Sequence, residues 1–172
     1  MIPEIRKILY ATDLSANSAY AFRYAIISAK KHDAKIVVLH VLEQLSPGAQ
    51  AMVGAYIDGE VQEKVLKGNI TFTRDRIRKG LKTFCERELK GDPDCADRVD
   101  SIEVCEGFPV EEILKNADEL NCDVIIMGAH GKGMIKHAFL GSTTKRVLRR
   151  VKKPVFIIPL PEGGTDITFQ DM

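Results

Sequence analysis

Five short segments rich in β-branched residues constrain the fold of this chain more than any other feature of its sequence. They are Lys7–Ala11, Ile36–Val41, Ile102–Cys105, Asp123–Met127 and Val155–Ile158. Several are continuous apolar runs that do not alternate with polar residues, which is typical of strands covered on both faces. The pattern therefore predicts five strands of a parallel sheet.

Stretches with helical periodicity separate these segments. Apolar residues recur at helical spacing after Ser15, a predicted N-cap, and after Pro109, which suits the first helical position. A longer helix is predicted over Ile70–Leu89 with Gly91 as its C-cap, and a last one over Thr144–Val151. The alternation predicts an α/β fold, a three-layer doubly wound sandwich with helices on both faces of a five-stranded parallel sheet. The strand order that we expect is 3-2-1-4-5, in which the second and third strands build outward on one side of the first strand and the fourth and fifth on the other.

The 172 residues predict one domain, residues 1–160. Residues 43–59 exceed the roughly 2–6 residues of an ordinary strand-to-helix connection. They could form a lid, a partner surface or an extra helical turn, and the sequence leaves these alternatives open. We expect residues 161–172 to form a mobile tail.

The composition favours a cytoplasmic globular protein. Hydrophobic residues make up 45% and charged residues 28%, and the net charge of +1 gives no overall attraction to nucleic acid or membrane. The apolar runs are far shorter than the roughly 20 residues of a membrane-spanning helix, and the N-terminus lacks a signal-peptide pattern. The wide spacing of the four cysteines predicts reduced thiols and no metal or disulfide role. They are Cys85, Cys95, Cys105 and Cys122.

A glycine-rich stretch, Gly128–Arg146, lies between the fourth predicted strand and the last predicted helix. Glycines can adopt conformations closed to other residues and can expose their N–H groups, and Ser142 and Thr143 stand where the helix begins. Together these features predict an anion-binding concavity able to hold a polyphosphate. Nearby positive charge would come from His130, Lys132, Lys136 and His137. The spacing matches neither a P-loop nor the GxGxxG signature, and a flexible loop with a purely conformational role is the alternative.

The first predicted strand supplies a second feature of the same site. It ends in Ala11-Thr12-Asp13, and ligands of open parallel sheets bind beyond the carboxyl ends of strands where the strand order reverses. If the order reverses between the first and fourth strands, Asp13 lies next to the glycine-rich stretch. Asp13 as a simple helix cap is the alternative.

These residues together resemble the universal stress protein family. The carrying features are the motif Gly128-x2-Gly131-x9-Gly141-Ser142, the opening run KILYATD followed by Ser15, the strand ends LHV and DVIIMG, and the run KPV before the last strand. The resemblance extends from about Ile5 to Pro159. The glycine motif is similar to that of the family's ATP-binding members, as opposed to the members that lack it.

The resemblance implies roles for individual residues. Asp13 would bind the ribose or adenosine part of ATP, ADP or AMP, the backbone of Val41 would meet the adenine edge, and Ala11 and Met127 would line that pocket. The phosphates would lie on the glycine amides and the start of the last helix, with Mg or Mn carried by the phosphates. The complete candidate site is Ala11, Thr12, Asp13, Val41, Met127, Gly128, His130, Gly131, Lys132, Gly141, Ser142 and Thr143.

The last predicted strand suggests an oligomer. Val155, Phe156, Ile157 and Ile158 would form an uncovered apolar edge, which invites pairing with a second copy. Members of the family are commonly homodimers through this strand, and a further, unknown protein partner would read the nucleotide state.

Three functions are compatible with these observations. The favoured one is an adenine-nucleotide-dependent switch in a stress response, and the first alternative is a slow ATPase using Asp13, His130 or Lys132. The second alternative is nucleic-acid binding by basic residues of the last helix, opposed by the absence of interleaved aromatic residues. Those residues are Lys145, Arg146, Arg149, Arg150, Lys152 and Lys153.

Overall fold

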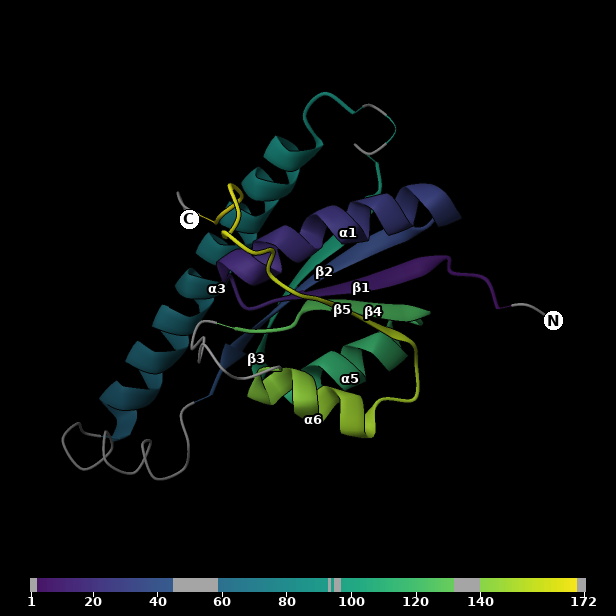
Figure 1. Cartoon of the computed structure of the whole chain (residues 1–172). Coiled ribbons are helices and arrows are strands. Elements are labelled where there is room, and N and C mark those ends of the chain that lie inside the picture. Colours follow the sequence, from purple (N-terminus) through teal and green to yellow (C-terminus); the bar gives the residue numbers. More distant parts are fainter. Residues whose placement is uncertain (1–2, 45–58, 93, 95–96, 132–139, 170–172) are drawn as a thin grey trace.

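The computed structural model describes residues 3–44, 59–92, 94, 97–131 and 140–169. Its sheet has the order β3-β2-β1-β4-β5, and every pair of neighbouring strands is parallel (Figure 1). The predicted α/β fold and strand order are therefore confirmed. The elements are β1 (Lys7–Thr12), α1 (Ala16–His32), β2 (Lys35–Glu43), α3 (Gly59–Leu89), β3 (Val99–Gly107), α5 (Pro109–Glu119), β4 (Val124–Gly128), α6 (Ser142–Arg150) and β5 (Val155–Ile158).

Helices cover both faces of the sheet, and successive residues of β1 point into two separate cores. Ile8 and Tyr10 pack with α1 and α3 on one face, whereas Leu9 and Ala11 pack with α5 and α6 on the other. The residues of β1 from Ile8 to Thr12 are thus buried whichever way they point. This two-sided burial is the physical reason for the continuous apolar runs in the sequence.

Local signals in the sequence set the ends of the helices. The Ser15 side chain caps α1 by accepting a hydrogen bond from the Ser18 amide at 3.2 Å. Pro109 is the first residue of α5, and Gly91 follows α3 with φ +98°, a conformation that favours glycine. Most of the connecting segment predicted at 43–59 lies outside the described residues. Its two ends are described, since β2 ends at Glu43 and α3 begins at Gly59.

The segment after β5 packs against α1 and α3. Ile167 and Phe169 are buried in the core beneath these helices, and the Phe169 ring lies 4.2 Å from the Phe84 ring, centroid to centroid. The prediction of a mobile tail did not include this packing. These two apolar residues alternate with polar ones in a short segment, so the sequence shows no periodic pattern that would predict their burial.

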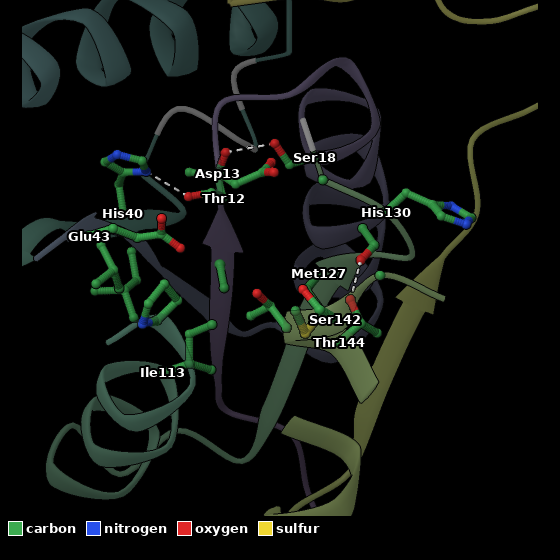
Figure 2. A pocket seen from close by; sticks show the side chains of 18 of the residues that line it. Thr12, Asp13, Ser18, His40, Glu43, Ile113, Met127, His130, Ser142 and Thr144 are labelled. Carbon is green, nitrogen blue, oxygen red and sulfur yellow. Dashed lines mark hydrogen bonds between the residues drawn. The ribbon is translucent and has the colours of Figure 1, made fainter. Parts of the chain in front are cut away.

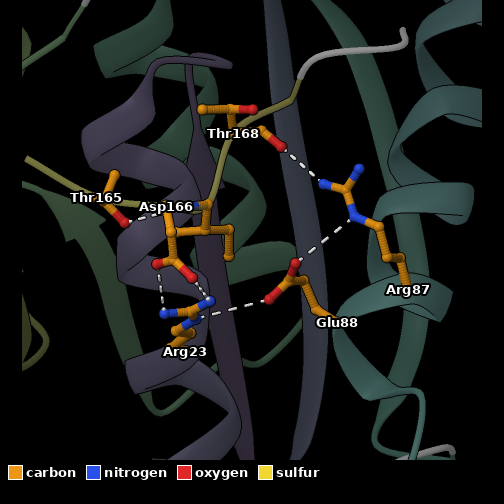
Figure 3. A network of polar contacts seen from close by, with 7 residues as sticks. Arg23, Arg87, Glu88, Thr165, Asp166 and Thr168 are labelled. Carbon is orange, nitrogen blue, oxygen red and sulfur yellow. Dashed lines mark hydrogen bonds and ion pairs between the residues drawn. The ribbon is translucent and has the colours of Figure 1, made fainter.

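Polar contacts join the same segment to the two helices (Figure 3). Arg23 of α1 donates two hydrogen bonds to the Asp166 carboxylate, at 3.0 and 3.3 Å, and forms an ion pair with Glu88 of α3. Arg87 of α3 donates a hydrogen bond of 2.7 Å to the carbonyl oxygen of Thr168. The guanidinium of Arg23 lowers the pKa of Asp166. The segment therefore joins α1 and α3 through both apolar and charged contacts.

Membrane-spanning helices are absent from the part of the chain that the structure describes, where no helix is long and apolar enough to cross a bilayer.

Candidate functional site

A cavity of about 500 Å³ opens at the carboxyl ends of β1, β2 and β4 (Figure 2). The strand order reverses between β1 and β4, since the chain builds β2 and β3 on one side of β1 and then crosses to β4 and β5 on the other. This is the position where open parallel sheets bind ligands, and the volume lies within the roughly 300–1,000 Å³ of small-molecule sites.

The structure brings the candidate residues of the sequence together around this cavity. Those that line it are Ala11, Thr12, Asp13, Val41, Met127, Gly128, His130, Gly131, Gly141, Ser142 and Thr143. Lys132, and with it Lys136 and His137, lies outside the described residues. The cavity wall also contains residues that the sequence reasoning missed: Ser18, Leu39, His40, Leu42, Glu43, Pro109, Ile113 and Thr144.

Most of the missed residues could not be found from sequence spacing. Pro109 and Ile113 belong to α5, whose first turn reaches the cavity only because α5 packs under β1 and β2. His40 and Glu43 could have been anticipated, because they lie at the carboxyl end of β2 beside the end of β1. His40 Nδ1 lies 2.8 Å from the carbonyl oxygen of Thr12, which joins the two strand ends.

One side of the cavity is apolar. Ala11, Leu39, Met127 and Ile113 are buried members of the core between the sheet and α5 and α6, and Val41 packs against that core. Their outer atoms line the cavity. An apolar wall of this kind suits a flat ring with little charge.

Asp13 and Gly131, which both line the cavity, lie against each other. A Cβ atom placed on Gly131 would lie 2.5 Å from Asp13 Oδ2, closer than real contacts allow. The Asp13 carboxylate is fixed by the Ser15 amide, which donates a hydrogen bond of 3.0 Å to Oδ1. A larger residue at position 131 would therefore displace the Asp13 carboxylate oxygen.

The glycines of the motif serve close packing, which corrects the conformational reason given for them above. Among the described glycines, those with positive φ are Gly91, Gly107, Gly163 and Gly164, and none of them belongs to the motif. Gly128 instead lies against Asn17, since a Cβ there would be 3.0 Å from Asn17 Cγ. The requirement for glycine is thus steric at positions 128 and 131.

Helices α1, α5 and α6 begin at this cavity. The first turn of α5 begins with Pro109, which has no N–H group, and contains Glu111 and Glu112, so it disfavours an anion. The first turns of α1 and α6 differ. The Ser15 side chain caps α1, whereas Gly141 is the N-cap of α6 and no side chain caps that helix. The first turn of a helix has N–H groups without partners inside the helix and a partial positive charge. The start of α6, at Ser142 and Thr143, is therefore the described part of the cavity best able to receive an anion.

Two of the predicted phosphate contacts need correction. The Gly141 amide is already engaged, because it donates a hydrogen bond of 2.8 Å to the carbonyl oxygen of Ala129. Figure 2 shows the His130 imidazole pointing away from the cavity, so His130 contributes its backbone there. Its amide donates a hydrogen bond of 2.8 Å to Asn17 Oδ1.

The described residues contain no group of three or more His, Cys, Asp or Glu side chains that could hold a metal ion. Cys85, Cys105 and Cys122 are free thiols in the structure, and Cys95 lies outside the described residues. Burial raises the pKa of Cys85 to about 12 and that of Cys122 to about 11, so both stay protonated at neutral pH. A thiolate ligand or nucleophile at these two positions is therefore disfavoured.

Acidic residues of α5 engage part of the basic surface on α6. Arg150 donates two hydrogen bonds to the Glu111 carboxylate, one of them 2.7 Å long. Lys153 forms an ion pair of 3.3 Å with Asp118 and donates hydrogen bonds to the carbonyl oxygens of Ala117 and Cys122. These contacts give Arg150 and Lys153 structural roles.

Comparison with known proteins identifies relatives that share this fold. The family model described as the universal stress protein family matches residues 4–159. Universal stress protein MJ0577 of Methanocaldococcus jannaschii is 28% identical over 153 residues, which cover 89% of this chain and 94% of that protein. The solved structure of MJ0577 aligns with a TM-score of 0.69 and covers 93% of this chain and 99% of that one.

Two further solved structures share the fold and contain bound nucleotides. A universal stress protein in complex with cAMP is 24% identical, with a TM-score of 0.52, and the match covers 91% of this chain and 98% of that one. The Arabidopsis thaliana family member At3g01520, with AMP bound, is 15% identical, with a TM-score of 0.56, and the match covers 92% and 94% of the two chains. At these identities the likeness concerns the fold.

Proposed function

The chain belongs to the universal stress protein family, and from this premise we propose that it binds an adenine nucleotide, ATP in the first instance, and acts as a nucleotide-dependent switch. The observation that carries the proposal is the uncapped start of α6, which opens into the same cavity as the apolar wall. One cavity thus offers an apolar surface for a base and helix N–H groups for phosphates. Related proteins that hold cAMP or AMP support the choice of adenine.

The proposed pose follows from this division of the cavity. Adenine lies on the apolar wall of Ala11 and Met127, with its edge at the backbone of Val41. The ribose lies beside Asp13, whose carboxylate can accept hydrogen bonds from its hydroxyl groups. The phosphates lie at Gly131 and the first turn of α6.

A divalent ion fits this proposal as a companion of the nucleotide. Mg²⁺ is commonly bound through substrate phosphates and one or two carboxylates, and it keeps several waters. The described cavity residues include the carboxylates of Asp13 and Glu43. We therefore propose that Mg or Mn would be held mainly by the phosphates and would neutralise part of their charge.

The role of the α6 amides can be tested by removing one N–H group. Proline is tolerated at the first position of a helix, and Gly141 before it has the extended conformation that proline requires. Ser142→Pro should raise the Kd for ATP about tenfold, because a hydrogen bond to a charged group is lost, and should leave adenosine affinity unchanged. Isothermal titration with ATP, AMP and adenosine measures both effects.

A matched control exists at the start of α1. Ala16 is the first residue of α1 and also follows an extended residue, but α1 is capped by Ser15. Ala16→Pro should leave ATP affinity unchanged, and Ser142→Ala separates the loss of the hydroxyl from the loss of the amide. Equal affinities for ATP in the wild type and Ser142→Pro would exclude α6 as the phosphate site. Wild-type protein that binds no adenine nucleotide, with none recovered by mass from purified samples, would refute the proposed function itself.

We further propose that the protein is a homodimer through β5. Within the described residues β5 pairs with β4 on one side, and the Phe156 side chain is 37% exposed. A free apolar edge of this kind favours pairing between copies. Sedimentation at micromolar concentration should therefore show a dimer, and Phe156→Lys should shift it to the monomer.

The control for this substitution is Phe72→Lys, on α3, where the side chain is 70% exposed. It makes the same change of residue type at a distance from β5 and should leave the dimer intact. A wild-type protein that sediments only as a monomer would contradict the proposed interface.

A further inference from the structure

Asn17 is a buried polar residue that no proposed ligand contact explains. It is the second residue of α1 and only 3% exposed. A buried carboxamide is stable only when its donors and its acceptor have partners, because an unpaired polar group costs about 1–3 kcal/mol. Its partners therefore indicate what the residue is for.

The two ends of the carboxamide bind two different segments. Nδ2 donates a hydrogen bond of 3.0 Å to the carbonyl oxygen of Ile158, at the end of β5. Oδ1 accepts a hydrogen bond of 2.8 Å from the amide of His130, in the loop after β4. Because one partner is an acceptor and the other a donor, the orientation of the amide group is fixed.

Gly128 makes this close approach possible. A Cβ on Gly128 would lie 3.0 Å from Asn17 Cγ and 3.3 Å from the Asn17 carbonyl carbon. The first glycine of the motif is thus explained by the packing of Asn17.

Further hydrogen bonds extend from this contact to the start of α6. The Ile158 carbonyl also accepts from the Ala129 amide, at 2.8 Å, and the Ala129 carbonyl accepts from the Gly141 amide, at 2.8 Å. The Thr144 hydroxyl donates to the Gly128 carbonyl at 3.2 Å, as Figure 2 shows. Residues 128–131 and the first turn of α6 are therefore joined into one unit, which Asn17 ties to α1 and β5.

We propose that Asn17 is a positioning residue of the cavity: its carboxamide holds the turn at Gly128–Gly131 against the start of α6 and couples this turn to the end of β5. Leucine has a similar size but offers neither hydrogen bond, and aspartate would set a carboxylate oxygen against the Ile158 carbonyl. The effect on ligand binding rests on the proposed nucleotide function. The effect on the loop does not.

The experiment compares Asn17→Ala with Asn116→Ala. Asn116 is a partly buried asparagine of α5 whose Nδ2 donates a hydrogen bond of 2.8 Å to the carbonyl oxygen of Glu112, and it does not line the cavity. The first readout is hydrogen exchange of the His130 amide by NMR, which needs no ligand. It should accelerate roughly tenfold or more in Asn17→Ala and stay unchanged in Asn116→Ala.

The second readout is the ratio of affinities for ATP and adenosine. In Asn17→Ala the Kd for ATP should rise roughly tenfold while that for adenosine changes less than about twofold, because only the phosphate-binding part is displaced. Unchanged hydrogen exchange at the His130 amide, or an equal loss of affinity for both ligands, would overturn the proposal.

If Asn17→Ala does not fold, Asn17→Asp serves in its place, because it retains the acceptor for the His130 amide. That amide should then stay slow to exchange, and fast exchange there would also overturn the proposal. If the wild type binds no nucleotide, the proposed function fails and His130 exchange alone decides the role of Asn17.

Discussion

Replacing Gly131 by valine is expected to raise the Kd for ATP roughly a hundredfold, or about 2.8 kcal/mol. The reason is local: the first added carbon would lie 2.5 Å from Asp13 Oδ2, so the carboxylate must leave its position. The rest of the valine side chain would enter the space that we assign to the phosphates. Titration calorimetry measures the loss, and circular dichroism verifies that the fold persists.

The comparison with Lys132→Ala separates the contribution of the loop backbone to ATP binding from that of a lysine side-chain charge. Lys132 lies outside the described residues, and a lysine acting through solvent contributes only about 0.2–1 kcal/mol. Gly131→Val should therefore reduce ATP affinity more than Lys132→Ala does. The reverse order would contradict the view that the loop backbone and the start of α6 form the main binding surface.

A double-mutant cycle tests whether Gly131 acts through Asp13. Gly131→Ala introduces only the clashing carbon, and Asp13→Ala removes the group with which it clashes. If the clash is the cause, the double variant should bind ATP no more weakly than Asp13→Ala alone. Additive losses would show that the two residues act independently.

Replacing Phe169 by alanine is expected to lower the free energy of unfolding by about 2–3 kcal/mol. The ring packs on Phe84, which in turn contacts Phe22, so the three rings connect the chain end with α3 and α1. The loss should fall somewhat below the roughly 3–5 kcal/mol of a fully buried phenylalanine, because the Phe169 side chain remains 8% exposed. Urea denaturation followed by circular dichroism measures the change.

Phe72→Ala is the control for this substitution, since an exposed side chain contributes within about 0.5 kcal/mol. Asp166→Ala removes the partner of Arg23 and should cost less than Phe169→Ala, because both charges are exposed. An unchanged urea midpoint in Phe169→Ala would mean that the tail behaves as the mobile segment predicted from the sequence.

The fold could be predicted because burial leaves a clear pattern. A strand such as β1 is apolar along its central residues Ile8–Ala11 because helices cover both of its faces, and Ser15 and Pro109 carry local signals for helix starts. The tail could not be predicted in the same way. Ile167 and Phe169 are isolated apolar residues, and the Phe169 ring packs on the Phe84 ring of α3, which lies far earlier in the chain.

The candidate site was predictable at Asp13 and the glycine motif from the residues themselves, and at Val41 and Met127 from the resemblance to the family. Asp13, Val41 and Met127 line the cavity because parallel strands end at one edge of the sheet. Ile113 could not be predicted, since an apolar helix residue carries no sign of facing a ligand. Asn17 was missed because asparagine near a helix start is usually a local capping residue.

The sequence by itself determined the fold and the edge of the sheet where the cavity lies, because periodicity and strand ends are local properties of the chain. The resemblance to the family added residues of the cavity wall such as Ala11, Val41 and Met127. Only the tertiary structure decided why the glycines are needed and which amides remain for a ligand. Gly131 lies against the Asp13 carboxylate, and Gly128 lies against the Asn17 side chain. The Gly141 amide donates its hydrogen bond to the Ala129 carbonyl oxygen. These are distances between segments far apart in the chain, and such distances are set by packing rather than by neighbouring residues.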